Sequence, residues 1–133
     1  MSQPASGNPA EMRIRRAGTA IARSPDGIAS APFWVEWLLE GREDGEMTAM
    51  RATVDPGIRT RWHSHPLGQL LYVLHGVGEV QRDGGAVEAV RAGDSVWFAP
   101  DERHWHGAAD SVFVYVSIQP IWNGTAVHWM EPV

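Results

Sequence analysis

Two histidine pairs, each with one residue between its members, are the part of this sequence best suited to chemistry: His63 with His65, and His104 with His106. Alternate residues of a β-strand point to the same face, so each pair can direct two imidazoles to one place. Gln69 follows at another even offset and offers an amide oxygen. Three neutral imidazoles and an amide oxygen suit a first-row divalent ion and leave positions open for water or substrate. The spacing predicts a divalent transition-metal site that takes its ligands from these two histidine pairs and Gln69.

Other metal ligands and nucleophiles are largely missing from the chain. It contains no cysteine, and all 11 residues counted as lysine or arginine are arginine. Disulfides, thiolate ligands and lysine Schiff bases are therefore excluded. His75 and His128 stand alone in the sequence, and we interpret both as structural.

Composition and length define the class of protein. With 133 residues, 44% hydrophobic and 20% charged, the sequence is typical of one globular domain. Its net charge of -5 argues against a nucleic-acid partner. We find neither a signal peptide nor the roughly 18 consecutive apolar residues of a membrane span. We expect a cytoplasmic protein that acts on a small molecule and has no membrane partner.

Short strand-like runs separated by Gly, Pro and Asp dominate the chain from residue 33 onward, which indicates an all-β antiparallel barrel or sandwich. Residues 1–12, rich in Pro, Ser, Gly and Ala, are predicted to be a flexible arm, and 13–133 the barrel. The stretch 122–133 is either an irregular tail or an extra strand. The expected strands are 33–40, 47–54, 69–75, 77–82, 86–90, 95–98, 104–107 and 112–119.

Strand alternation also predicts which side chains surround the metal. Leu71 and Val73 lie at even offsets from Gln69, so we expect them, together with Val54 and Phe98, to form an apolar cavity wall. Trp62 and Trp105 lie at odd offsets from the ligands and should face away. Such a pocket suits a small aromatic or aliphatic oxygenated molecule.

Two further residues are candidates for catalysis. His106 is the predicted general acid or base, because an imidazole titrates near neutral pH; alternatively it orients His104 or forms a hydrogen bond within the barrel. Tyr115 shares a strand face with Phe113, Ser117 and Gln119. Its hydroxyl either donates to a substrate oxygen or anion, or is bound to a backbone partner.

Residues 57–76 resemble the first motif of the cupin superfamily: Gly, five residues, His-x-His, three residues, an acid, six residues, Gly. Only the acid differs, being Gln69. Residues 93–104 resemble the second motif, with Ala99 and Asp101 in place of Pro and Gly, and with its histidine at His104. The resemblance implies a single-domain, jelly-roll-like cupin barrel with these four positions around a divalent metal.

Over roughly residues 46–133 the chain also resembles the bacterial manganese-dependent cupin hydroxynitrile lyases. That resemblance implies manganese on Gln69 and the three histidines, with His106 beside the substrate. Iron, nickel, zinc and cobalt stay open. A further catalytic histidine of that family is replaced here by Tyr115, if the chains are aligned on Ile118 and Gln119.

Gln69 in place of the usual Glu leaves the bound metal its full 2+ charge, which strengthens Lewis-acid polarisation and disfavours the 3+ state. This favours non-redox lyase, isomerase or hydrolase chemistry over oxygen activation, and the resemblance to the hydroxynitrile lyases implies a metal-dependent, lyase-type enzyme. A cupin dioxygenase or isomerase on the same site is the alternative, and a non-catalytic cupin that binds a small ligand is the third. The resemblance also implies a homodimer, in which the N-terminal segment or the 33–39 strand covers a free sheet edge.

Overall fold

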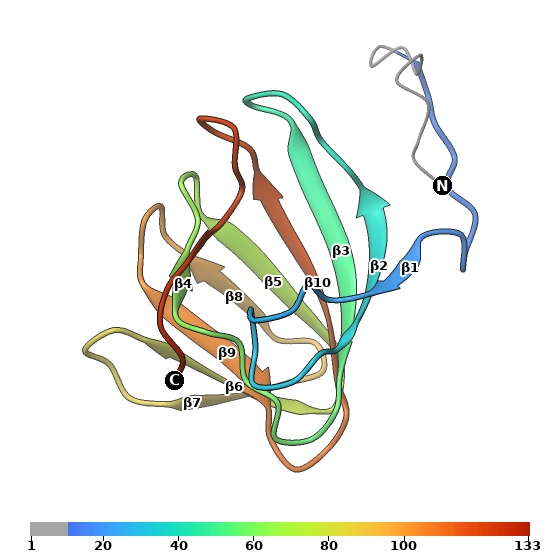
Figure 1. The fold of residues 1–133 in the computed structure, drawn as a ribbon. Helices are drawn as coiled ribbons and strands as arrows, with labels where there is room; N and C mark the ends of the chain where they lie inside the picture. Colours follow the sequence, from blue (N-terminus) through green and yellow to red (C-terminus); the bar gives the residue numbers. More distant parts are fainter. Residues whose placement is uncertain (1–10) are drawn as a thin grey trace.

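The computed structural model describes residues 11–133, which form two antiparallel sheets packed as a barrel (Figure 1). The predicted all-β cupin fold is confirmed. The six-stranded sheet contains, in spatial order, β1 (Ile21–Arg23), β2 (Trp34–Leu39), β3 (Met47–Val54), β10 (Phe113–Pro120), β5 (Gln69–His75) and β8 (Ser95–Phe98). The five-stranded sheet contains β11 (His128–Trp129), β4 (His63–Ser64), β9 (His104–Ala108), β6 (Val77–Arg82) and β7 (Glu88–Arg91). Residues 11–133 include no helix that could cross a membrane.

Strand β10 lies in the middle of the six-stranded sheet, between β3 and β5. Its side chains alternate between buried and half-buried, and those of β5 between buried and exposed over most of their length, as expected for strands with one face on a core. The inward residues Leu71, Val73, Phe113 and Tyr115 are almost completely buried. This alternation places Tyr115 and Gln119 on the same inward face as Gln69.

The predicted strands lie within a few residues of the observed ones; the run expected at 86–90, for example, is β7 at Glu88–Arg91. Two short strands, β1 and β4, were not predicted, and β11 was one of two alternatives for the tail. Each has two or three residues, too few to show a period, and is defined by its pairing partner. The tail of the chain does contain an extra strand, because β11 pairs with β4. The arm predicted at 1–12 lies, except for its last two residues, outside the described part of the chain.

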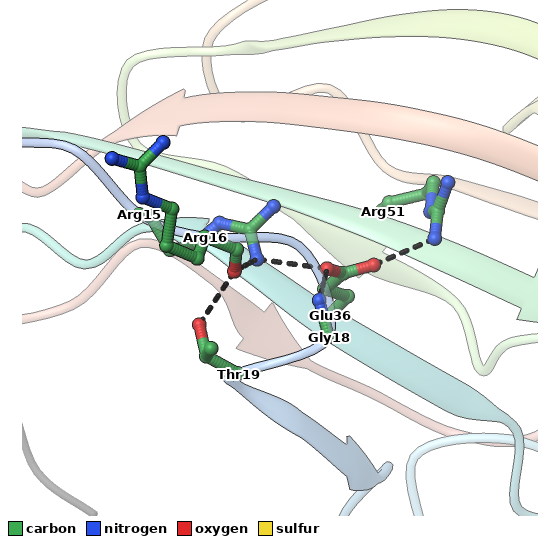
Figure 2. Close-up of polar contacts among 6 residues, drawn as sticks. All are labelled: Arg15, Arg16, Gly18, Thr19, Glu36 and Arg51. Carbon is green, nitrogen blue, oxygen red and sulfur yellow. Dashed lines mark hydrogen bonds and ion pairs between the residues drawn. The ribbon is translucent and has the colours of Figure 1, made fainter.

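A buried carboxylate attaches the segment before β1 to the outer face of β2 and β3 (Figure 2). Glu36 accepts hydrogen bonds from Arg15 at 2.8 Å, from the Gly18 backbone N–H at 3.1 Å and from Arg51 at 2.6 Å. The bond from Gly18, followed by that from Arg15, lowers the pKa of Glu36. Strand β1 then pairs with residues 34–36 of β2, so this part of the strand is not a free edge.

Candidate metal centre

The side chains predicted to bind metal come from both sheets. His63 and His65 lie in and just after β4, His104 begins β9, and Gln69 begins β5 of the other sheet. The turn that links them depends on Gly68, whose φ of +85° is left-handed and whose added Cβ would approach the Trp97 ring to 2.5 Å. The Gly68 N–H closes this turn onto the carbonyl of His65 at 3.1 Å. Glycine therefore allows the ligand segment to pass from one sheet to the other within four residues.

Asp101, which stands where the second cupin motif usually has glycine, supports the same loop. Its φ of 62° is left-handed, a conformation that Asp adopts more readily than most residues. Its backbone N–H donates to the His65 carbonyl at 2.9 Å. Asp101 therefore adopts a left-handed conformation that glycine would also adopt readily.

Three imidazoles of the site are oriented by backbone carbonyls. The Nδ1 atoms of His63, His65 and His104 lie at hydrogen-bond distance from the carbonyl oxygens of Arg61 (2.8 Å), Ala126 (2.7 Å) and Glu102 (2.9 Å). A carbonyl can only accept, so each Nδ1 carries the proton and each Nε2 keeps its lone pair. This is the arrangement usual for histidines that bind metal.

Stacking holds His104 further in place, and its Nε2 and the Gln69 oxygen, both acceptors, face each other without a hydrogen bond. The Phe98 ring stacks on the His104 imidazole, with centroids 3.6 Å apart and planes at 9°. His104 Nε2 lies 3.3 Å from Gln69 Oε1. The amide nitrogen of Gln69 points the other way and donates to Gln119 Oε1 at 2.9 Å. The amide oxygen therefore faces the imidazoles.

Burial keeps these histidines neutral. It lowers the pKa of His65 to about 4 and that of His104 to about 3. Burial also lowers the pKa of His63 far below its usual value, with a further contribution from the neighbouring histidines. At neutral pH the imidazoles thus need lose no proton before they bind an ion.

His106 and Tyr115 differ from these residues because their polar atoms have no partner. Both side chains are buried, and neither the two ring nitrogens of His106 nor the hydroxyl of Tyr115 forms a hydrogen bond. The two rings meet edge to face at a centroid distance of 5.1 Å. Burial lowers the pKa of His106 and raises that of Tyr115, so both are neutral at pH 7. The backbone bond expected as the alternative for Tyr115 does not form.

Two overlapping sets of histidines could hold a metal ion. Ligand nitrogens of His63, His104 and His106 lie within 4.8 Å of one another. The set predicted from the sequence has His65 in place of His106. His65 Nε2 is buried without a partner while its Nδ1 is oriented by a carbonyl, and His106 has no such orienting bond. By distance the structure groups His106, and not His65, with His63 and His104, whereas the orienting bond on Nδ1 is found at His65. With either set, three imidazoles and the Gln69 amide oxygen fit a divalent ion.

A cavity of about 300 Å³ adjoins this cluster. His63, His65, Gln69, His106 and Tyr115 all line it, so the structure brings five of the six predicted site residues to its wall. His104 lies behind them, fully buried. No aspartate or glutamate lines this cavity, which leaves an apolar chamber with few polar groups.

The apolar wall differs from the predicted one. Val54, Leu71, Val73 and Phe98 are buried in the core rather than exposed to the cavity. Even offsets from Gln69 gave the face of Leu71 and Val73 correctly, but the barrel is filled at that depth. The wall is instead formed by Ile28, Phe33, Val35, Trp37, Met50 and Trp129, which come from β2, β3, β11 and the loop after β1.

The other residues considered from the sequence lie away from the cavity. Trp105 is buried and donates to Gln81 at 2.8 Å, and Trp62 packs under the Arg103 guanidinium, whose central carbon is 4.4 Å from the ring centroid. Their predicted outward orientation agrees with this arrangement. His75 and His128 are exposed strand residues. Thr48 and Thr60 also line the cavity wall and were not predicted. Strand alternation can give the face on which such a side chain lies, but it does not show which residue of another strand lies opposite.

The fold and the histidine cluster together define a class of protein. The cupin domain profile matches residues 50–118, a span that contains every predicted ligand, and the chain belongs to the cupin family. It is 42% identical over 124 residues to an (R)-mandelonitrile lyase of Granulicella tundricola, which covers 92% of this chain and 95% of the relative. The resemblance to the cupin hydroxynitrile lyases is confirmed.

Solved structures support the fold. A cupin-like protein from Thermotoga maritima superposes with a TM-score of 0.78 at 32% identity, over 84% of this chain and 86% of that one. The polyketide cyclase RemF from Streptomyces resistomycificus superposes with a TM-score of 0.73 at 19% identity, over 92% and 88% of the two chains. The second similarity extends to the fold alone.

Proposed function

We propose that this protein is a metal-dependent lyase that cleaves, and in reverse forms, the bond between a cyanide carbon and the carbon bearing a hydroxyl in a small aromatic or aliphatic cyanohydrin. The observation that carries the proposal is the buried, unpartnered pair His106 and Tyr115 in the wall of an apolar cavity, beside three oriented imidazoles. The similarity to a mandelonitrile lyase supports the same reaction and suggests the (R)-enantiomer.

His106 is the proposed general base and acid. Its neutral ring accepts the proton of the substrate hydroxyl as the carbonyl double bond forms and the bond to the cyanide carbon breaks. The bonding electrons leave with cyanide, and the protonated ring returns its proton to cyanide, so aldehyde and hydrogen cyanide are the products. The lowered pKa of His106 favours this return, because a buried imidazolium is a strong acid.

Tyr115 is proposed to assist the departing anion. Since burial raises its pKa, the phenol keeps its proton throughout and serves as a hydrogen-bond donor rather than as a base. The hydroxyl has no protein partner to give up, so a donation to substrate is gained without loss of an existing bond.

His63, His65, Gln69 and His104 are the proposed ligands of a divalent ion, which we take to be manganese. When bound, such an ion supplies a Lewis acid for an oxygen or nitrile of the substrate. The four ligands carry no charge, so the ion keeps its 2+ charge in a cavity whose wall contains no carboxylate. A neutral ligand set favours Lewis-acid chemistry over a change of oxidation state.

The test is benzaldehyde release from (R)- and (S)-mandelonitrile by protein stripped of metal, by the same protein reloaded with Mn²⁺, and by the Mn²⁺-loaded unchanged chain. We expect release that depends on metal and prefers the (R)-enantiomer. Release no faster than the buffer background with Mn²⁺, Fe²⁺, Zn²⁺, Ni²⁺ and Co²⁺ would overturn the proposed activity.

An oxygenase or isomerase on the same site is the second candidate, favoured by Tyr115 at the position where the family resemblance implies a second catalytic histidine. Oxygen uptake by the iron-loaded protein with phenols distinguishes an oxygenase from the lyase. A non-catalytic cupin would instead retain a small ligand through purification without converting it, which mass spectrometry of the denatured protein would detect.

Assembly and location stay predictions. We propose a homodimer, to be checked by the molar mass from light scattering on the eluting full chain. A cytoplasmic location rests on the absence of cysteine and is checked by fractionating cells of the native host.

A further inference from the structure

A chain of side-chain hydrogen bonds leads from strand β3 through β10 to the Gln69 amide. The Thr48 hydroxyl donates to the backbone carbonyl of Gln119 at 2.7 Å, and the Gln119 amide nitrogen donates to the Thr48 hydroxyl at 2.7 Å. Gln119 Oε1 accepts from Gln69 Nε2 at 2.9 Å, and Gln69 Oε1 faces His104. Thr48 and Gln119 are paired residues of neighbouring strands, so the backbone fixes their separation.

The donor and acceptor of every hydrogen bond in this series follow from the first bond, in which the Thr48 hydroxyl donates to the Gln119 carbonyl. A backbone carbonyl can only accept, so the single proton of the Thr48 hydroxyl is committed to it. The hydroxyl oxygen can then only accept from the Gln119 side chain, which must present its nitrogen. Gln119 consequently turns its amide oxygen toward Gln69, and the amide nitrogen of Gln69 donates to it. The remaining end of the Gln69 amide, its oxygen, points to the imidazoles.

We propose that Thr48 and Gln119 are positioning residues that orient the Gln69 amide with its oxygen toward the metal centre. The inference rests on the proposed metal site, and it matters there because an amide oxygen binds a divalent ion whereas an amide NH₂ repels it. Without this direction, the two orientations of a glutamine amide are nearly equal in shape. The side chains of Thr48, Gln69 and Gln119 are buried in the wall of the cavity.

A matched pair of variants separates the hydroxyl from the shape of Thr48. Thr48→Val keeps the volume and the preference for a strand but removes the hydroxyl, whereas Thr48→Ser keeps the hydroxyl. The measurement is the Mn²⁺ dissociation constant of the full chain, by competition with a fluorescent chelator and by the electron paramagnetic resonance signal of free Mn²⁺. Loss of an outer partner of a metal ligand costs about 10- to 100-fold in affinity. Gln119 is that partner of Gln69 and Thr48 acts one bond further out, so we expect a loss of up to about 10-fold for Thr48→Val and at most about a twofold change for Thr48→Ser.

The same substitution in a Gln69→Ala background distinguishes positioning from a general effect on the barrel. If Thr48 acts through the Gln69 amide, Thr48→Val weakens Mn²⁺ binding in the unchanged chain and has no further effect once the amide is absent. Equal weakening in both backgrounds would show a structural role and overturn the proposal. The melting temperature of each metal-free variant records whether the barrel is folded.

The variant Gln119→Glu provides a second, independent test of the proposed orientation of the Gln69 amide. A carboxylate can only accept, so Glu at 119 requires the nitrogen of Gln69 regardless of Thr48. With Glu at 119, Thr48→Val should no longer weaken Mn²⁺ binding; a persistent loss would contradict the proposal. If the unchanged chain binds no Mn²⁺, the proposed metal site fails and the inference with it. If it binds Mn²⁺ and Thr48→Val binds equally well, the inference alone fails.

Discussion

The four buried histidines of the barrel fall into two groups. His63, His65 and His104 each have one ring nitrogen at hydrogen-bond distance from a backbone carbonyl and the other turned inward. His106, two residues from His104 on the same strand, has two ring nitrogens without any partner. Its neighbour Tyr115 likewise leaves its hydroxyl unpaired.

The contrast separates two tasks. A ligand must hold one orientation before the ion arrives, and a bond to the backbone provides it. A group that exchanges protons with a substrate must keep its polar atoms available. Leaving those atoms without a hydrogen bond lowers the free energy of unfolding. Two histidines at neighbouring inward positions of one strand are thus suited to different tasks by their hydrogen bonds alone.

The largest effect should follow from removing an oriented imidazole. His104→Ala should weaken Mn²⁺ binding by more than the roughly 100-fold that loss of an outer partner costs, and abolish metal-dependent activity. Metal content by elemental analysis and chelator competition measure it. His75→Ala, which changes an exposed histidine on β5, is the control. Unchanged affinity in His104→Ala would remove this residue from the ligand set.

Replacing the unoriented histidine should affect the rate instead. His106→Gln should lower kcat by about 10²- to 10⁴-fold, the usual contribution of a general acid or base, with Mn²⁺ affinity within about twofold of the unchanged chain. Kinetics with mandelonitrile and chelator competition on the same preparation measure both. Loss of the metal in this variant would instead make His106 a ligand, as its distance to His63 and His104 also allows.

Acid should destabilise the metal-free protein. The folded-state pKa values of His65 and His104, about 4 and about 3, lie below the value of about 6.5 for an unfolded chain. Between these values the unfolded state binds more protons, so the free energy of unfolding falls as pH drops below 6.5, by about 1 kcal/mol per pH unit for each such histidine. Urea titrations of metal-free protein between pH 7.5 and 4.5 measure it. A flat profile would contradict the burial of neutral imidazoles.

The smallest effect concerns the unpaired hydroxyl. Tyr115→Phe should raise the free energy of unfolding by about 1 kcal/mol, because it removes a buried polar group without a partner, while lowering kcat. Urea titration and mandelonitrile kinetics measure the two. A loss of stability would show that the hydroxyl has a partner in the folded protein.

Local pattern in the sequence predicted an antiparallel barrel or sandwich with the predicted site residues on its inward face, and the resemblance to the cupin motifs selected the barrel. The two His-x-His pairs, the even offset of Gln69 and the alternation along β10 gave the inward face of six site residues. These depend on strand period and turn residues, which are properties of neighbouring positions.

Features formed by pairing between distant segments were not predictable. Ala126 O, which orients His65, is 61 residues away, and Thr48 is 71 residues from its partner Gln119. The depth to which side chains fill a barrel is also a property of the whole fold, which is why Leu71 and Val73 face inward and yet lie below the cavity.

The cavity wall has a consequence for how such proteins diverge. The predicted ligands, together with His106 and Tyr115, fall within residues 50–118, whereas much of the remaining wall, including Arg23, Phe33, Trp37 and Trp129, comes from the flanks. Substitutions in the flanks can therefore change which molecule enters while the reactive centre stays intact. Exchanging these flanks between related barrels should transfer substrate preference as a module, which makes them the natural target for directed evolution.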